Sequence, residues 1–203
     1  LFYLPNYKTY LIYYYNMPLK TPICDFGQAA KSFELKSTNN QIVKLNDVKG
    51  ENGTLVMFIC NHCPYVIAVI EDIIEDCKNL KKIGVKAVAI CSNDSLNYPD
   101  DSFDKMIEFH KNHNLNFPYL IDETQKIAKD YGAVCTPDFF GYNRNLELQY
   151  RGRIRELDNL KPIKSDESDL FRAMKKIVET NKGPKKQIPS MGCSIKWLDN
   201  ECI

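Results

Sequence analysis

Two cysteines, Cys60 and Cys63, are the residues of this chain with the clearest capacity for chemistry. His62 lies between them and Pro64 follows directly, within the stretch MFICNHCPYV. Cysteines at this spacing form redox dithiols, supply half of a zinc site, or lie close together as structural sulfurs. The choice among these depends on the secondary structure that carries the pair.

The pair lies where a buried strand is expected to end and a helix to begin. Residues 54–60, TLVMFIC, form a continuous apolar run that is typical of a strand buried on both faces. From Pro64 the apolar residues recur at helical spacing until Gly84, and proline suits a first helical turn because its missing N–H is not needed there. That turn presents unpaired N–H groups, so a sulfur beside it is stabilised as a thiolate.

This placement favours a redox dithiol with distinct roles for its residues. We expect Cys60, as the more exposed sulfur, to attack, and Cys63 to resolve the mixed disulfide. The imidazolium of His62 favours the thiolate, which stabilises the reduced state and makes the disulfide more oxidising. We therefore expect a more oxidising dithiol than one with Gly-Pro between its cysteines, on a scale where a tenfold change in equilibrium is about 30 mV.

A metal site is the main alternative for the two cysteines. Zinc needs four ligands, usually from two close pairs, and a second Cys-x-x-Cys is absent from the sequence. His110 and His113 leave a Cys2His2 set open, but they lie far along the chain on a helix with ordinary surface neighbours. We expect no metal and no dissociable cofactor, since the Cys60–Cys63 disulfide itself would be the redox group.

The composition excludes several classes of partner. The chain has 203 residues, is 44% hydrophobic and 26% charged, and carries a net charge of +1, as in a soluble globular protein without a basic face. We expect neither nucleic acid nor membrane as a partner, because no apolar run reaches the roughly 18 residues of a membrane span. Cys77 and Cys91 lie in apolar patterns and are expected to be buried free thiols in a reducing cytoplasm.

The chain is expected to hold one domain with an extension at each end. Residues 1–16 are rich in tyrosine and lack the basic region and cleavage site of a signal peptide, so we interpret them as an extension outside the domain. The alternative is a degenerate export signal, and with it a periplasmic rather than cytoplasmic location. The domain itself is expected over residues 17–181, followed by a polar tail over 182–203.

The remaining elements alternate between strands and helices. Hairpins are predicted over residues 33–45 and 137–152, a second buried strand over 85–91, and helices over 100–114, 123–132 and 167–181. This order predicts an α/β fold with a central mixed sheet flanked by helices, an N-terminal β-hairpin and a C-terminal tail.

Three motifs in this order resemble the peroxiredoxin-like thioredoxin-fold proteins, the group of alkyl hydroperoxide reductase and thiol-specific antioxidant protein. They are CNHCP at the strand–helix junction, VCTPDFF at 134–140 and GCSIKW at 192–197, and ICDFGQAAKSFEL at 23–35 resembles the opening of that group's domain. The resemblance covers roughly residues 17–200 and implies a thioredoxin fold. It also implies that Thr136 and Pro137 match the cis-proline that faces the cysteines and lines the groove for substrate backbone.

The chain departs from peroxiredoxins proper at two places. They carry a threonine or serine three residues before the peroxidatic cysteine, and here Cys60 occupies that position before Cys63. Their arginine near the cis-proline has no counterpart in VCTPDFF, although three arginines follow, Arg144, Arg151 and Arg153. Because the hydroxyl and guanidinium would polarise a peroxide and stabilise the thiolate, thiol–disulfide exchange ranks first and peroxide reduction by Cys63 second.

Two further cysteines are candidate auxiliary redox sulfurs. Cys135 precedes the cis-proline by two residues, and Cys193 lies in GCSIKW; the alternatives are an apolar filler and a tail docked by Ile195 and Trp197. A copper or zinc carrier is less expected, since copper chaperones of this fold space their cysteines one residue wider. The expected partners are protein or small-molecule disulfides and thiols, an upstream dithiol reductant and, in the peroxidase alternative, a hydroperoxide.

Overall fold

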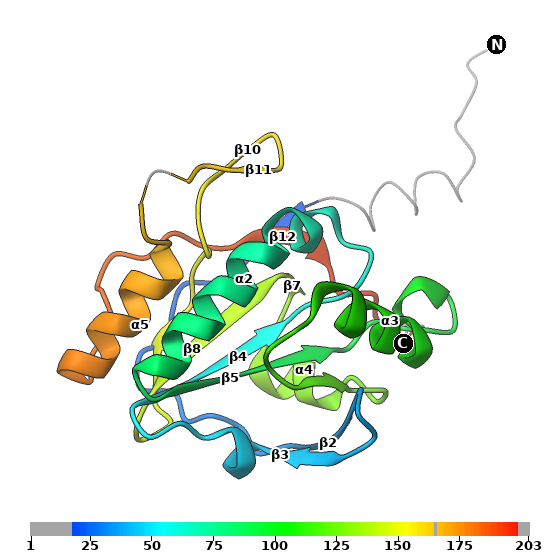
Figure 1. Ribbon diagram of the computed structural model, residues 1–203, viewed down its shortest axis with the longest axis horizontal. Helices are drawn as coiled ribbons and strands as arrows, with labels where there is room; N and C mark the ends of the chain where they lie inside the picture. Colours follow the sequence, from blue (N-terminus) through cyan, green and yellow to red (C-terminus); the bar gives the residue numbers. More distant parts are fainter. Residues whose placement is uncertain (1–17, 165, 199–203) are drawn as a thin grey trace.

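A seven-stranded mixed sheet forms the centre of the computed structural model, which describes residues 18–164 and 166–198 (Figure 1). The strand order is β3-β2-β6-β5-β4-β8-β9; β4 is parallel to β5 and β5 to β6, and the other neighbours are antiparallel. The bounds are β2 Glu34–Ser37, β3 Ile42–Lys44, β4 Gly53–Phe58, β5 Val85–Cys91, β6 Tyr119–Ile121, β8 Asp138–Asn143 and β9 Leu148–Tyr150. The predicted central mixed sheet and both predicted hairpins are confirmed, while the extension over residues 1–16 lies outside the described residues.

Strand β4 is buried along its whole length, as its continuous apolar sequence predicts. Its side chains alternate between two cores: Leu55 and Met57 pack on one face of the sheet, and Val56 and Phe58 on the other. Both faces must therefore be covered by helices or loops. The strand that leads to the cysteine pair is thus held from both sides.

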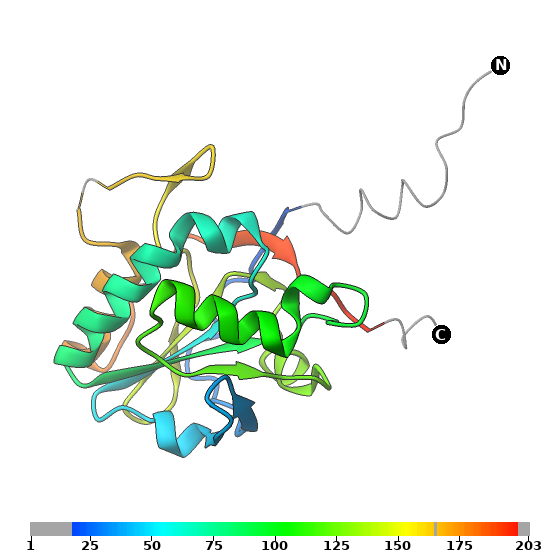
Figure 2. The same ribbon diagram turned by 45° about the vertical axis from the view of Figure 1, so that its right-hand side comes forward.

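Three helices cover one face of the sheet, and a short one covers the other (Figures 1 and 2). The first face carries α2 (Pro64–Lys82), α3 (Phe103–His113) and α5 (Asp169–Thr180), and the second carries α4 (Lys126–Tyr131). Three helices, α3, α4 and α5, begin two or three residues later than predicted. Residues Pro99–Asp101 form a separate 3-10 turn before α3, and Gln125 takes a left-handed conformation (φ 61°) directly before α4.

A second, three-stranded sheet was not predicted. It consists of β1 (Pro18–Lys20), β12 (Met191–Ser194) and β7 (Cys135–Thr136), with β12 in the middle and antiparallel to both neighbours. Figure 1 shows β12 beside the end of α2 at which that helix begins. Residues 182–198, expected as part of a polar tail, therefore include a central strand, and Ile195 after it is buried in the core.

Two other features complete the described chain. A 3-10 helix, Leu45–Val48, follows β3, and a small hairpin of β10 (Leu157–Asp158) and β11 (Lys161–Pro162) projects before α5 (Figure 1). Among the described residues, no helix combines the length and the apolar character needed to cross a membrane.

Candidate active site

The cysteine pair lies at the junction of β4 and α2, as the sequence predicts. Strand β4 ends at Phe58, and the helix begins at Pro64 with Cys63 as its N-cap residue. The Cys63 carbonyl accepts the first helical hydrogen bond, from the Ile67 N–H at 3.0 Å. The Cys63 sulfur is thereby placed at the electropositive end of a long helix, where a negative charge is stabilised.

Strand β7 brings Thr136 against both cysteines. The peptide bond between Thr136 and Pro137 is cis, as the family resemblance implies. The Cys60 Sγ lies 3.3 Å from the Thr136 hydroxyl oxygen, and the Cys63 thiol donates to the Thr136 carbonyl oxygen at 3.1 Å. Residues far apart in sequence therefore meet in one compact site.

The expected greater exposure of Cys60 does not distinguish the two cysteines. Cys60 is 1% exposed and Cys63 is 0% exposed, so neither is open to solvent. The start of α2, strand β7 and the three-stranded sheet close over the pair. Exposure to solvent therefore gives no reason to choose Cys60 over Cys63 as the attacking sulfur.

A third sulfur, that of Cys193, belongs to this site. Cys193 lies opposite Thr136 in the pairing of β12 with β7, is half-buried, and is hydrogen-bonded through its sulfur to Cys63. Gly192 makes the close approach possible: a Cβ atom there would lie 2.0 Å from the Thr136 carbonyl oxygen. The glycine of GCSIKW is therefore required for β12 to lie on β7.

The three sulfurs hold their protons very differently. Hydrogen bonds from Cys193 and from Cys60, in that order, lower the pKa of Cys63 far below its ordinary value. The pKa of Cys60 is raised by its hydrogen bond with Cys63, by burial and by the charge of Asp101, and the pKa of Cys193 is raised by its hydrogen bond with Cys63 and by burial. Of the three sulfurs, Cys63 is therefore the one that ionises first; its thiolate, once it has given up the proton donated to Thr136, accepts hydrogen bonds from two thiols.

Asp101 is a site residue that the sequence did not reveal. Its carboxylate is fully buried and lies 2.8 Å from the His62 Nδ1, and it accepts hydrogen bonds from the Asn61 N–H at 2.8 Å and the Asn93 amide at 2.7 Å. The hydrogen bond to Asp101 raises the pKa of His62. The same negative charge raises the pKa of Cys60, so Asp101 offsets the imidazolium charge that was expected to favour the thiolate.

The histidines of the HKNH stretch do not join the cysteines. His110 shares a hydrogen bond of 2.8 Å with the Thr38 hydroxyl, and the His113 ring packs on Phe109 at 4.4 Å between centroids. Within the described part of the chain, the metal-binding type of cluster is instead Cys60, His62 and Asp101, whose ligand atoms lie within 4.8 Å of one another. The two Asp101 oxygens accept hydrogen bonds from Asn61 and Asn93, and Asp101 also pairs with His62. Hydrogen bonds therefore hold this cluster together.

The arginines that follow the cis-proline are engaged elsewhere. Arg151 forms a buried ion pair with Asp138 at 2.9 Å and stacks on Phe140, on the face of the sheet opposite the cysteines. Arg153 pairs with Asp169 at 2.7 Å, and Arg144 is exposed at a hairpin turn. Cys135 is fully buried and burial raises its pKa, which fits the apolar-filler alternative better than a redox role.

A cavity of about 210 Å³ lies next to Pro137. Its walls include Tyr65 from the first turn of α2, Ser190 before β12, and Arg153. Burial, and then the charges of Cys193 and Cys63, raise the pKa of Tyr65. Pro137 in the cavity wall directly follows Thr136, which contacts both Cys60 and Cys63. A small ligand in this cavity would therefore lie close to the reactive sulfurs.

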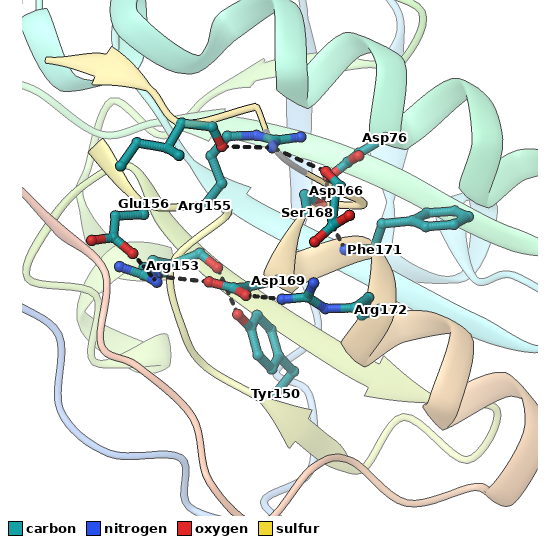
Figure 3. A network of polar contacts seen from close by, with 11 residues as sticks. Asp76, Tyr150, Arg153, Arg155, Glu156, Asp166, Ser168, Asp169, Phe171 and Arg172 are labelled. Atoms are coloured by element: carbon teal, nitrogen blue, oxygen red, sulfur yellow. Dashed lines mark hydrogen bonds and ion pairs between the residues drawn. The ribbon is translucent and has the colours of Figure 1, made fainter. Parts of the chain in front are cut away.

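A polar network supports this cavity from α5 (Figure 3). Asp169, at the start of α5, holds Arg153 and also pairs with Arg172. Nearby, the Ser168 hydroxyl caps α5 through the Phe171 N–H and donates to Asp76 of α2. The network fixes α5 to α2 and keeps the Arg153 side chain in the cavity wall.

Comparisons of the sequence with known proteins give matches to one family. The sequence model of the AhpC/TSA family matches residues 26–157. "Peroxiredoxin Bcp" of Bacillus subtilis (strain 168) is 24% identical over 128 residues, 63% of this chain and 73% of that protein. "Peroxiredoxin Q, chloroplastic" of Oryza sativa subsp. japonica is 25% identical over 115 residues, 57% of this chain and 48% of that protein, so the chain spans about half of its length.

Solved structures resemble the whole described fold. An uncharacterized conserved protein from Geobacillus kaustophilus has a TM-score of 0.86 and 38% identity, covering 90% of this chain and 97% of that one. The thioredoxin domain of a thiol-disulfide oxidoreductase from Bacteroides vulgatus has a TM-score of 0.58 and 13% identity, covering 75% and 97%. The second likeness shows a thioredoxin fold. The family match ends before β12, so it leaves the role of Cys193 open.

Proposed function

The chain belongs to the AhpC/TSA family, and on this premise we propose that it is an oxidoreductase that carries out thiol–disulfide exchange through Cys60 and Cys63. The observation that supports this most directly is the contact of both sulfurs with Thr136, before the cis-proline, at the start of α2. Two sulfurs in one buried site can form and release a disulfide without a further cofactor.

Cys63 is the attacking sulfur in this proposal, and Cys60 resolves. The Cys63 thiolate attacks one sulfur of a substrate disulfide, forms a mixed disulfide and releases one substrate thiolate, which takes up a proton. Cys60 then loses its proton and attacks the Cys63 Sγ, which yields the Cys60–Cys63 disulfide and releases the second substrate thiol. Two electrons pass to the substrate, and an external dithiol returns them in the reverse sequence.

This assignment reverses the roles expected from the sequence, for an electrostatic reason. The nucleophile is the thiolate, and the low pKa of Cys63 keeps that sulfur ionised while the raised pKa of Cys60 keeps the second sulfur protonated. His62 and Asp101 act on this balance from the side of Cys60. Thr136 and Pro137 form the wall against which the substrate sulfur is presented.

Peroxide reduction is the second candidate, favoured by the ionised Cys63 directly before Pro64. The thiolate would attack the peroxide to give a sulfenic acid and water or an alcohol, and a second thiol would condense with it to give a disulfide and water. Arg151 pairs with Asp138 on the opposite face of the sheet, Arg153 in the cavity wall is paired with Asp169, and Cys60 replaces the hydroxyl residue of peroxiredoxins three positions before Cys63. We therefore rank this reaction second.

Single-turnover trapping tests the proposal. Reduced protein is mixed with excess hydroxyethyl disulfide or hydrogen peroxide, quenched with acid and analysed by mass spectrometry with peptide mapping. Cys60→Ser combined with Cys193→Ala is expected to accumulate a mixed disulfide on Cys63, Cys63→Ser to react with neither compound, and the control Cys77→Ala to behave as the wild type. A mixed disulfide on Cys60 in Cys63→Ser, at the wild-type rate, would overturn the assignment; rapid reaction with peroxide alone would make the protein a peroxidase.

We also propose a setting for this activity. The substrates are thiols and disulfides, and the electrons come from an upstream dithiol protein or small molecule. A cytoplasmic location suits a site that needs three reduced sulfurs, because that compartment keeps thiols reduced. Disulfide mapping on protein alkylated within cells tests this, with reduced Cys60, Cys63 and Cys193 as the expected result and a stable disulfide as the contrary one.

A further inference from the structure

The edge of β7 beside the cysteines is already occupied by the chain itself. Cys193 and Ser194 of β12 pair antiparallel with Thr136 and Cys135. On its other side, β12 pairs with β1. An extended polypeptide that adds to a sheet needs a free row of backbone N–H and C=O groups. The row next to the cis-proline is not free while β12 is in place.

Strand β12 packs closely against this edge of β7. Gly192 approaches the Thr136 carbonyl so closely that a Cβ would lie 2.0 Å from its oxygen and 2.6 Å from its carbon. Beyond the strand, the Ser190 hydroxyl donates to the Pro137 carbonyl at 2.8 Å, and the Ser190 N–H donates to the Thr21 hydroxyl at 3.0 Å. Contacts on both sides of the cis-proline peptide therefore hold β12 in place.

The residue of β12 that meets the reactive site is itself a cysteine. Cys193 lies opposite Thr136 with its sulfur on Cys63, which is where a substrate cysteine paired to β7 would stand. Cys63 is 0% exposed, whereas Cys193 is half-buried. Cys193 therefore stands between Cys63 and solvent, and the small cavity opens beside Pro137 and Met191, which flank this strand pair.

We infer that β12 is an internal occupant of the substrate edge, which restricts the dithiol to small-molecule thiols and disulfides and excludes extended polypeptides. This inference rests on the proposed exchange activity and names its substrate class. A small disulfide enters the cavity without displacing a strand, whereas a polypeptide must break the pairing of β12 with β7. Because Cys193 occupies the place of a substrate cysteine, it also forms a disulfide with Cys63 when Cys60 is removed.

The test compares substrates of different size in the wild type, in Gly192→Ala and in Gly27→Ala. The first substitution forces β12 away from Thr136, while a Cβ at Gly27 meets nothing within 4 Å, so Gly27→Ala is the control for a glycine replacement that makes no steric clash. The measured quantity is the ratio of the reduction rates of insulin and of hydroxyethyl disulfide. We expect a low ratio in the wild type and in Gly27→Ala, and a rise of about tenfold or more in Gly192→Ala, because the edge is then free.

A second measurement does not depend on turnover, so it separates failure of this inference from failure of the proposed function. The rate of Cys63 alkylation by iodoacetamide is expected to rise in Gly192→Ala but not in Gly27→Ala.

In Cys60→Ser, one equivalent of hydrogen peroxide is expected to take two electrons and two protons from Cys63 and Cys193 and give their disulfide and two waters. Equal reduction of insulin by the wild type and Gly192→Ala, or unchanged alkylation of Cys63 in a folded Gly192→Ala, would overturn the inference. If Gly192→Ala does not fold, the wild type alone decides. The inference is overturned if the wild type reduces insulin rapidly while its β12 amides stay protected from hydrogen exchange. It is supported if the wild type reduces hydroxyethyl disulfide but not insulin.

Discussion

Cys193 lies directly opposite Thr136 in the antiparallel pair of β12 and β7. Thr136 thereby contacts all three cysteines of the site: its hydroxyl contacts Cys60, its carbonyl contacts Cys63, and its backbone pairs with Cys193. The site therefore holds three sulfurs rather than two.

Removing the Cys193 thiol is expected to raise the pKa of Cys63. Cys193 is the largest cause of the low pKa, because its thiol donates a hydrogen bond that stabilises the Cys63 thiolate. Cys193→Ala should shift the thiolate absorbance titration to higher pH, and Cys193→Ser, whose hydroxyl still donates, should shift it less. The control is Cys135→Ala. Identical titration curves for wild type and Cys193→Ala would contradict the hydrogen-bond account.

Asp101→Asn is expected to lower the pKa of His62, because the main cause of the raised value is its hydrogen bond to that carboxylate. A histidine with a raised folded-state pKa contributes stability below its unfolded pKa, and this contribution is lost as the pH rises through the folded-state value. The gap in unfolding free energy between wild type and variant should thus narrow with rising pH. NMR titration of the imidazole gives the pKa directly, and an unchanged His62 value in Asp101→Asn would refute the prediction.

Asp76 is expected to make the protein less stable as the pH rises from about 4 to 7. Burial is the main cause that raises its pKa from 3.8 to about 7, so the unfolded chain releases this proton before the folded chain does. Asp76→Asn cannot ionise and keeps an acceptor for Ser168, so it should gain stability relative to wild type across this range, by on the order of a few kcal/mol. Urea unfolding at several pH values measures this. Glu179→Gln, exposed on α5, is the control; parallel curves for wild type and Asp76→Asn would rule the effect out.

The buried ion pair of Asp138 and Arg151 is expected to be costly to break. Asp138→Asn leaves the guanidinium buried without its counter-charge, which destabilises by about 3–5 kcal/mol. Asp130→Asn, which removes the exposed partner of Lys126, should cost less than about 1 kcal/mol. Chemical denaturation of both variants makes the comparison, and similar losses in the two would show that burial does not determine the cost.

The parts of this fold that the sequence predicts are those with a strong local pattern. Strand β4 is a continuous apolar run, and α2 has apolar residues at helical spacing after a proline, so the junction that carries Cys60 and Cys63 is visible in the sequence. Strands β7 and β12 span only Cys135–Thr136 and Met191–Ser194, which is too short for a periodic signal. Their existence depends on contacts between distant segments.

The details of the site depend on the same distant contacts. Asp101 meets His62 only because the segment after β5 folds back over the start of α2, and an acidic residue before a helix is otherwise read as part of its first turn. Likewise, the burial of Cys60 depends on a distant segment, since Thr136 of β7 lies against its sulfur. In the sequence, only the pair Gly192 and Cys193 points to this contact, since a glycine beside a cysteine indicates close approach of two backbones.

The pairing of β1 with β12 joins Leu19 to Gly192 and so closes nearly the whole described chain into one loop. Such a long-range contact forms late, because the entropy of closing the loop must be overcome before the contact is gained. During synthesis β12 also leaves the ribosome after the other described strands and helices. Until β12 has been made and has paired with β7, the edge beside Cys60 and Cys63 is uncovered, so a nascent chain presents a more open dithiol than the finished protein.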